Sequence, residues 1–204
     1  MGLESDKRRL PSQQRSRERF DRILEAASAI IAERGCDGLK MSEIASRSGM
    51  SLGALYQYFP DKPAIIMTLA AHFNAASRAC VTAGLAGVKD AGDLSAAFAD
   101  LMNQYWDTVR AEPVMRDIWS GMQANKELAI AQSEESRFCA ALLSAALQQV
   151  HPNVARNVLN RTSLLVWELG EAAVRLALCL SPAEADEIIA TYTRMSLREL
   201  LNPV

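Results

Sequence analysis

The chain has 204 residues, half of them apolar, with 22 lysines and arginines against 24 aspartates and glutamates. That length can bury a substantial core as one or two domains. The four cysteines, at positions 36, 80, 139 and 179, are widely spaced and form no CxxC pair, which argues against a disulfide framework and against a zinc site.

The amino terminus is basic. Residues 7–22 carry seven lysines and arginines against two acidic residues, and no apolar stretch follows them, so we expect no secretory signal and a cytoplasmic protein. We interpret residues 1–14 as a flexible basic arm that lies along phosphates or enters a minor groove. The alternative for Lys7 to Arg9 is a disordered, solubilising tail.

Three helix patterns follow, at 17–34, 41–48 and 52–58, and the last two are separated by a short turn around Gly49. Gly49 can adopt the positive φ of a sharp helix-ending turn. Ser51 is placed to cap the third helix, and Leu55 to turn back onto the second. This pattern predicts a helix-turn-helix whose second helix enters a DNA groove.

The ends of these helices also predict local contacts. Lys40 precedes the second helix where a capping Ser or Thr is common, so we expect Glu43 to reach back to the free amide. Pro60 ends the third helix, and Asp61 caps the next one, which starts at Lys62.

The outward positions of this motif are the predicted DNA contacts. They are Ser42, Ser51, Leu52, Gly53, Ala54, Tyr56, Gln57, Tyr58 and Lys62. Since few of them carry donors toward the bases, specificity is expected to rest on thymine methyl contacts, close backbone approach at Gly53 and DNA shape.

The same residues resemble the tetracycline-repressor family of bacterial transcription regulators. The resemblance covers about the first third of the chain. It rests on Ile44-Ala45, Gly49, Leu55-Tyr56, Tyr58-Phe59 and Lys62, preceded by a helix with Ile23, Ala26, Ala27, Ile30 and Ile31 that ends at Gly35. It implies an all-α homodimer whose second domain binds a small molecule and releases DNA, with Tyr56, Tyr58 and Lys62 as phosphate contacts.

The rest of the chain is predicted as further helices, about nine in all. They span 62–81, 93–110, 113–122, 125–150, 153–180 and 183–201, with breaks at Gly84, Gly87, Gly92, Pro113, Pro152 and Pro182. We therefore expect a three-helix DNA-binding domain at 1–62 and a larger helical bundle at 63–204 for ligand binding and dimerisation. Residues 1–62 hold 11 lysines and arginines against 9 acidic residues, and the remainder holds 11 against 15. This asymmetry has the sign expected of a DNA-binding head.

The last two helices are apolar around most of their circumference. Such helices must be covered on all sides, so one face is expected to pack inside the domain and the other on a second copy, although burial in one monomer core is the alternative. The predicted dimer interface is Val166, Leu169, Ala173, Ile188 and Tyr192. Because Glu168, Glu171 and Arg175 interrupt residues 163–180, we expect no membrane span.

Large aromatic and thioether side chains suggest a ligand pocket, with plain core packing as the alternative for each of them. The predicted wall is Met102, Trp106, Trp119, Met122, Phe138 and Trp167, and the polar groups that orient a ligand are sought among Asn103, Gln123, Arg137 and Glu168.

No motif predicts catalysis, and the two histidines have no ligand-spaced partner, so we expect no enzyme, metal or cofactor. The favoured hypothesis is a repressor that leaves an inverted-repeat operator when it binds an apolar or amphipathic effector. The second is a helix-turn-helix regulator switched by thiol oxidation, with Cys36 as the sensor. The third, an enzyme or scaffold on a helical bundle, predicts no salt-dependent DNA binding.

Overall fold

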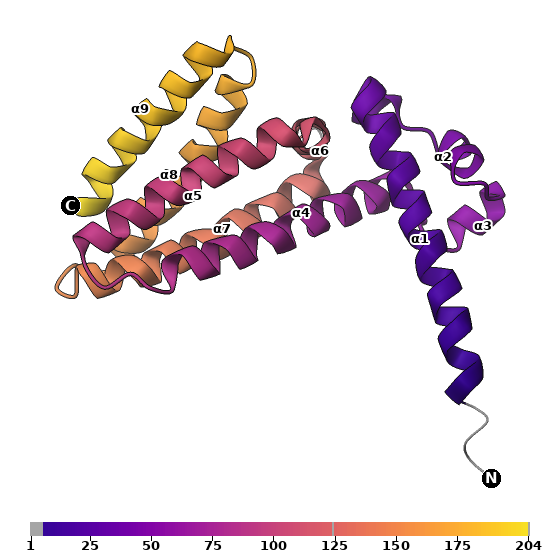
Figure 1. Cartoon of the computed structure of the whole chain (residues 1–204), viewed down its shortest axis with the longest axis horizontal. Coiled ribbons are helices and arrows are strands. Elements are labelled where there is room, and N and C mark those ends of the chain that lie inside the picture. The colour runs from indigo at the N-terminus through magenta and orange to yellow at the C-terminus, as the bar shows by residue number, and fades with distance from the viewer. Residues whose placement is uncertain (1–5, 124, 204) are drawn as a thin grey trace. The chain divides into compact units, whose positions relative to one another are not determined.

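The computed structural model describes residues 6–123 and 125–203, and these ranges contain nine α-helices, one short 3-10 helix and no strand. Figure 1 shows their order along the chain. The bounds are α1 Asp6–Arg34, η1 Cys36–Gly38, α2 Met41–Arg47, α3 Leu52–Tyr56, α4 Lys62–Leu85, α5 Ala91–Ala111, α6 Pro113–Gln123, α7 Lys126–Val150, α8 Arg156–Ala177 and α9 Pro182–Leu201. The all-α prediction is confirmed.

The first helix is longer than the sequence pattern indicated. Residues 1–5 of the predicted flexible arm lie outside the described residues, but α1 already begins at Asp6. No glycine interrupts the chain between Asp6 and Arg34, and arginine, glutamine and glutamate are good helix formers. The basic segment from Lys7 onward is therefore helical, and the expected start at residue 17 was wrong.

The chain divides into two compact units. Unit 1 comprises residues up to Ala71 together with Asp117–Leu128, and unit 2 comprises His72–Arg116 and Ala129–Val204. The helices α4, α6 and α7 each contribute residues to both units. The expected domain boundary after Lys62 falls in the first turn of α4, nine residues before this division.

Unit 1 is held together by aliphatic side chains from each of its helices. Ile23, Ala27, Ile30, Ile31, Ile44, Leu55 and Ile65 are fully buried. The ring of Phe20 stacks on that of Phe59 with centroids 5.2 Å apart, which fixes the segment after α3 against α1. Burying one such side chain contributes about 1.5–3 kcal/mol, so this small core holds α3 and the turn before it in place.

Unit 2 is a bundle in which α8 and α9 lie side by side as a hairpin, with α5 against α9 (Figure 1). Its fully buried aliphatic residues are Leu94, Val109, Leu147, Leu159, Val174 and Leu200. The inward face of α8 also carries Thr162, Ser163 and Gly170, small residues that permit a close approach of α9. The hydroxyl of Tyr192 on α9 donates to the carbonyl of Val166.

One helix contradicts the expectation that no segment could span a membrane. By length and composition alone α4 is long and apolar enough to do so. Core helices of water-soluble proteins pass the same test, so this is weak evidence for a membrane location.

Candidate functional site

The turn between α2 and α3 has the predicted geometry. Gly49 has φ +69°, and its amide donates to the carbonyl of Ser46 at 3.2 Å. The next amide, of Met50, donates to the carbonyl of Ala45 at 2.9 Å. A Cβ at position 49 would meet no atom within 4 Å, so glycine is needed there for its backbone conformation and not for space.

Helix α3, the predicted DNA-reading helix (the reader helix), has the expected Ser51 cap and the expected inward-facing Leu55. The hydroxyl of Ser51 accepts a hydrogen bond from the amide of Ala54 at 3.2 Å, and Leu55 is fully buried. Leu52 is 42% exposed and Tyr56 49% exposed, on the outward face of the helix. The helix ends at Tyr56, so the expected span to residue 58 was two residues too long.

The remaining outward positions also meet solvent. Ser42, Ser51, Gly53 and Gln57 are exposed, whereas Ala54 is partly buried. A Cβ at Gly53 would meet nothing within 4 Å, so the backbone there is open to close approach. The part of this surface formed by Leu52, Gly53 and Ala54 carries no side-chain hydrogen-bond donor.

Helix α2 is held by an ion-pair network that replaces the expected capping box. Glu43 Oε1 accepts hydrogen bonds from Arg34 at 2.5 Å and from Arg47 at 2.8 Å, so the carboxylate does not serve the Lys40 amide as predicted. Arg47 also donates to both carboxylate oxygens of Glu33, each at 2.7 Å. These side-chain hydrogen bonds lower the pKa of Glu33 and of Glu43. The network ties α2 to the end of α1.

The expected phosphate contacts lie around the start of α4. Asp61 Oδ1 accepts from the amide of Ala64 at 2.9 Å, which confirms Asp61 as the cap, and Lys62 is half-buried. Tyr56 is exposed, but the hydroxyl of Tyr58 is within 3.3 Å of the Ser16 hydroxyl. Tyr58 thus reaches α1, a contact that the sequence pattern did not show.

Comparisons with known proteins match both parts of the chain. Residues 23–67 match the model described as bacterial regulatory proteins, tetR family, and residues 92–204 match the tetracyclin repressor-like C-terminal domain. The chain belongs to the tetR family. It is therefore a transcriptional regulator of the tetR type.

Relatives of this tetR-family chain align with it over different lengths. The HTH-type transcriptional repressor KstR of Mycobacterium tuberculosis is 38% identical over 52 residues, which is 26% of this chain and 24% of that protein. The chain thus aligns with about a quarter of this curated relative. A tetR-family regulator from Streptomyces coelicolor is 26% identical with TM-score 0.66, covering 90% of this chain and 97% of the other.

The fold of a second solved protein is also similar. FadR from Bacillus subtilis, solved in complex with stearoyl-CoA, has TM-score 0.63 at 16% identity and covers 91% of this chain and 99% of its own. At that identity the likeness shows the fold alone.

The predicted pocket wall is divided between the two units of the regulator. Trp119 and Met122 lie on α6 in unit 1, and the other four lie in unit 2. Met102 and Trp106 are buried and Trp167 is partly buried, whereas Phe138 is 45% exposed with the Arg78 guanidinium 4.6 Å from its ring centroid. The role of these residues in ligand binding stays a prediction.

Trp106 has a structural role that the sequence did not indicate. Its indole Nε1 donates to Asp186 Oδ1 at 2.9 Å, and Arg110 lies 3.4 Å from the same oxygen. The guanidinium of Arg110 is also 5.6 Å from the Trp106 ring centroid. These contacts tie α5 to the N-terminal part of α9.

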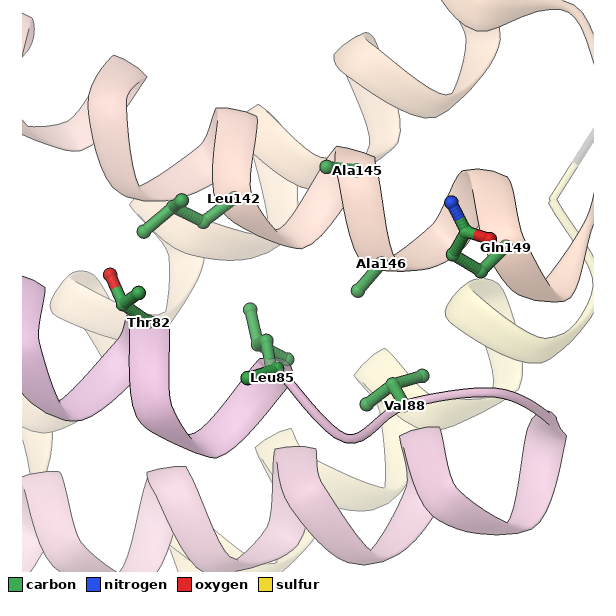
Figure 2. Close-up of a pocket in the computed structure, with 8 residues that line it drawn as sticks. Thr82, Leu85, Val88, Leu142, Ala145, Ala146 and Gln149 are labelled. Atoms are coloured by element: carbon green, nitrogen blue, oxygen red, sulfur yellow. The ribbon is translucent and has the colours of Figure 1, made fainter.

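A groove of about 480 Å³ opens at another place in unit 2 (Figure 2). Leu85 from α4 and Val88 from the following loop face Leu142, Ala145 and Ala146 on α7. None of the predicted wall residues lines it.

The polar groups proposed from the sequence do not face the interior. Asn103, Gln123, Arg137 and Glu168 are all exposed. Other polar side chains of unit 2 lie further inside, among them Glu135 and Ser136 on α7, which are buried, and Gln132 on α7 and Glu171 on α8, which are partly buried. The sequence carried a signal for Glu171, because an acidic residue interrupts an apolar helix there, but that signal was used only to exclude a membrane span.

The predicted dimer residues are not equally accessible. Leu169 is 50% exposed, Ala173, Ile188 and Tyr192 are partly buried, and Val166 is buried inside unit 2. The inner face of α8 therefore packs within unit 2. An exposed apolar stripe runs along its outer side and past its end, formed by Leu165, Leu169, Leu176 and Leu180.

The proposed thiol sensor is in the wrong environment for oxidation. Cys36 is buried, and its thiol donates to the carbonyl of Asp117 at 3.2 Å. Burial raises its pKa to about 11, which leaves little reactive thiolate. The prediction that a loop exposes Cys36 was wrong.

Proposed function

We propose that this regulator is a dimeric repressor that binds an inverted-repeat operator and leaves it when an apolar or amphipathic small molecule binds in unit 2. The observation that carries the proposal is the exposed face of α3, held outward by the Ser51 cap and the buried Leu55. Such a helix presents side chains to base edges while flanking residues contact phosphates. A cytoplasmic location would follow from this role.

The contact chemistry supports recognition by shape as well as by bases. Leu52 and Ala54 offer methyl groups to thymine, and Gly53 lets the backbone approach the groove floor. Ser42, Ser51, Tyr56, Gln57, Tyr58 and Lys62 supply the hydroxyl, amide and ammonium groups for phosphates and base edges. Few fixed donors to bases leave a large share of the specificity to DNA deformability.

A two-fold dimer through α8 and α9 is the proposed partner arrangement. The exposed leucines of α8 recur at helical spacing, and Met195 on α9 is 62% exposed. An exposed apolar stripe of this kind marks an interaction surface. In a two-fold dimer the same stripe of each copy packs against that of the other. Two readers related by such an axis require an inverted repeat in the DNA.

The proposed switch uses helices that belong to both units. Helix α6 starts in unit 2, and its second half packs in unit 1. There a Cβ on Gly121 would lie 2.5 Å from the Cys36 sulfur, so α6 touches the turn that precedes the helix-turn-helix. A ligand that favours one position of α6 or α4 would release DNA through such contacts, provided that it binds the two states differently.

The test is binding of labelled duplexes taken from the DNA that flanks the protein's own gene, measured by fluorescence anisotropy at several salt concentrations. We expect one flanking duplex to bind about 10³-fold or more tightly than an unrelated duplex of equal length, with affinity that falls as salt rises. A protein that binds no duplex in a salt-dependent manner would be the enzyme or scaffold, and the proposal would be wrong.

A further inference from the structure

Two carboxylates in unit 2, Glu135 with 7% and Glu171 with 17% of the side chain exposed, are compensated to different degrees. Glu135 on α7 is paired with Arg78, whose Nε donates to both carboxylate oxygens at 2.8 Å and whose Nη2 also donates to Oε2. Cys139 contributes a further contact at 3.7 Å. A buried charge normally needs this kind of partner, because the interior cannot solvate it.

Glu171 on α8 has weaker partners. Its Oε1 accepts from Gln132 Nε2 at 3.2 Å and from Ser136 Oγ at 3.3 Å, both long hydrogen bonds. Arg175 comes only to 3.9 Å from Oε2, beyond hydrogen-bond length. Burial, and then the negative charge of Glu168, raise the pKa of the Glu171 carboxyl.

The same place has an additional acceptor without a donor. Gln132 Oε1 is buried, and within the described residues it has no hydrogen-bond partner. Buried polar atoms are nearly always paired, so an orphaned acceptor beside an under-compensated carboxylate requires an explanation. The negative charge of Glu171, after burial, also contributes to the raised pKa of the Tyr105 hydroxyl and of the Cys139 thiol.

We propose that Glu171, Gln132 and Ser136 form the polar end of the effector site, and that the effector is an apolar molecule carrying a protonated amine. An ammonium group has three donors and no acceptor, so it matches Glu171 Oε2 and Gln132 Oε1 together and supplies the charge that Arg175 provides incompletely. An anionic head group would instead meet a like charge. The inference rests on the proposed function, because it names the class of effector.

The experiment compares decylamine, decanol and decanoate, which share one chain and differ in the head group. Each is titrated into the full-length protein below its micelle concentration, by calorimetry and without DNA. We expect the amine to bind about tenfold or more tightly than the alcohol, with decanoate weakest.

Substitutions assign that preference to residues. Glu171→Gln should reduce the amine-to-alcohol ratio to about one, since the neutral amide keeps the shape and loses the charge. Glu187→Gln, which changes an exposed carboxylate on α9 that does not act on Glu171, should leave the ratio intact. Gln132→Met should weaken the amine and spare the alcohol, and it provides a second measurement if Glu171→Gln fails to fold by circular dichroism.

Several results would overturn the inference: decanoate binding as tightly as the amine, an unchanged ratio in both Glu171→Gln and Gln132→Met, or no binding of any of the three. These titrations contain no DNA, so they are separate from the switch. Amine binding through Glu171 without operator release would contradict the proposed function alone. Operator release by other compounds, with no response to the amine, would contradict this inference alone.

Discussion

Lys62 is the first residue of α4 and follows the carboxylate that caps it. An ammonium group at that point reaches a phosphate oxygen but reads no base. Lys62→Ala should weaken binding to every duplex by a similar factor and lower the slope of log affinity against log salt by about one. The measurement is anisotropy on operator and unrelated DNA, with the exposed Lys89→Ala in unit 2 as the control. Changed sequence preference with an intact slope would contradict the assignment.

We expect Trp106 to stabilise the fold, independently of any contact with a ligand. The residue is 7% exposed, and its indole Nε1 donates a hydrogen bond to Asp186. Trp106→Ala should lower the free energy of unfolding by about 3–5 kcal/mol, because the ring leaves a cavity. Trp106→Phe keeps most of the packing, and its cost should be smaller. Denaturant unfolding measures both, and equal stability of Trp106→Ala and the unaltered protein would show that the ring is not part of the core.

Residue roles could be predicted from the sequence where their partners are close along the chain. The side chains of Ser51 and Asp61 each accept a hydrogen bond from the amide three residues later. Gly49 requires only a positive φ of its own backbone. Glu43 pairs with Arg34 nine residues away, and Trp106 with Asp186 eighty residues away. These partners depend on how helices pack, which no local pattern encodes.

At the level of elements, α6 and η1 pack closely in unit 1. A Cβ at Gly121 would lie 2.6 Å from the Cβ of Cys36, far inside van der Waals contact. Gly121→Ala should therefore lower the melting temperature, by overpacking that costs about 1–3 kcal/mol. The measurement is thermal unfolding followed by circular dichroism.

The matched control is a double variant that adds a Cβ at position 121 and removes the one at position 36. Cys36→Gly combined with Gly121→Ala restores the space, so the double variant should regain part of the lost stability. If Gly121→Ala were neutral, or if the double variant were simply the sum of both losses, the contact would not be the constraint that we describe.

The existence of the helices was predictable because apolar residues recur with helical period, and their ends were predictable where proline, glycine or a cap marks them. Helix α9 begins at Pro182, where the sequence marked a start. Helix α1 begins eleven residues earlier than predicted, and it runs through Pro11, a residue that usually stands in the first turn of a helix. The assignment of residues 117–128 to unit 1 depends on tertiary packing and was not predictable.

For the whole molecule, the first quantity to test is the dissociation constant of the proposed dimer. Leu169→Asp and Leu176→Asp place a charge on the exposed stripe of α8, whereas Val166→Asp would damage the fold because Val166 is buried. Each change at the stripe should weaken the free energy of dimer association by about 2 kcal/mol or more, which raises the dissociation constant about 30-fold. Light scattering at micromolar concentration measures it.

The matched control is Ile130→Asp, which charges an equally exposed aliphatic position on α7. This variant should remain a dimer. A monomer for the unaltered protein, or loss of the dimer in Ile130→Asp alone, would show that the stripe on α8 is not the interface.

Two-fold symmetry links the dimer to the DNA that it reads. The most direct test of the account is selection of bound duplexes from a library of random sequence by the full-length protein, followed by sequencing. We expect enrichment of an inverted repeat whose half-sites lie on one face of the duplex, with centres about 34–36 Å apart or more. Enrichment of a single unrepeated site, or no enrichment over the starting library, would contradict a dimeric, sequence-specific repressor.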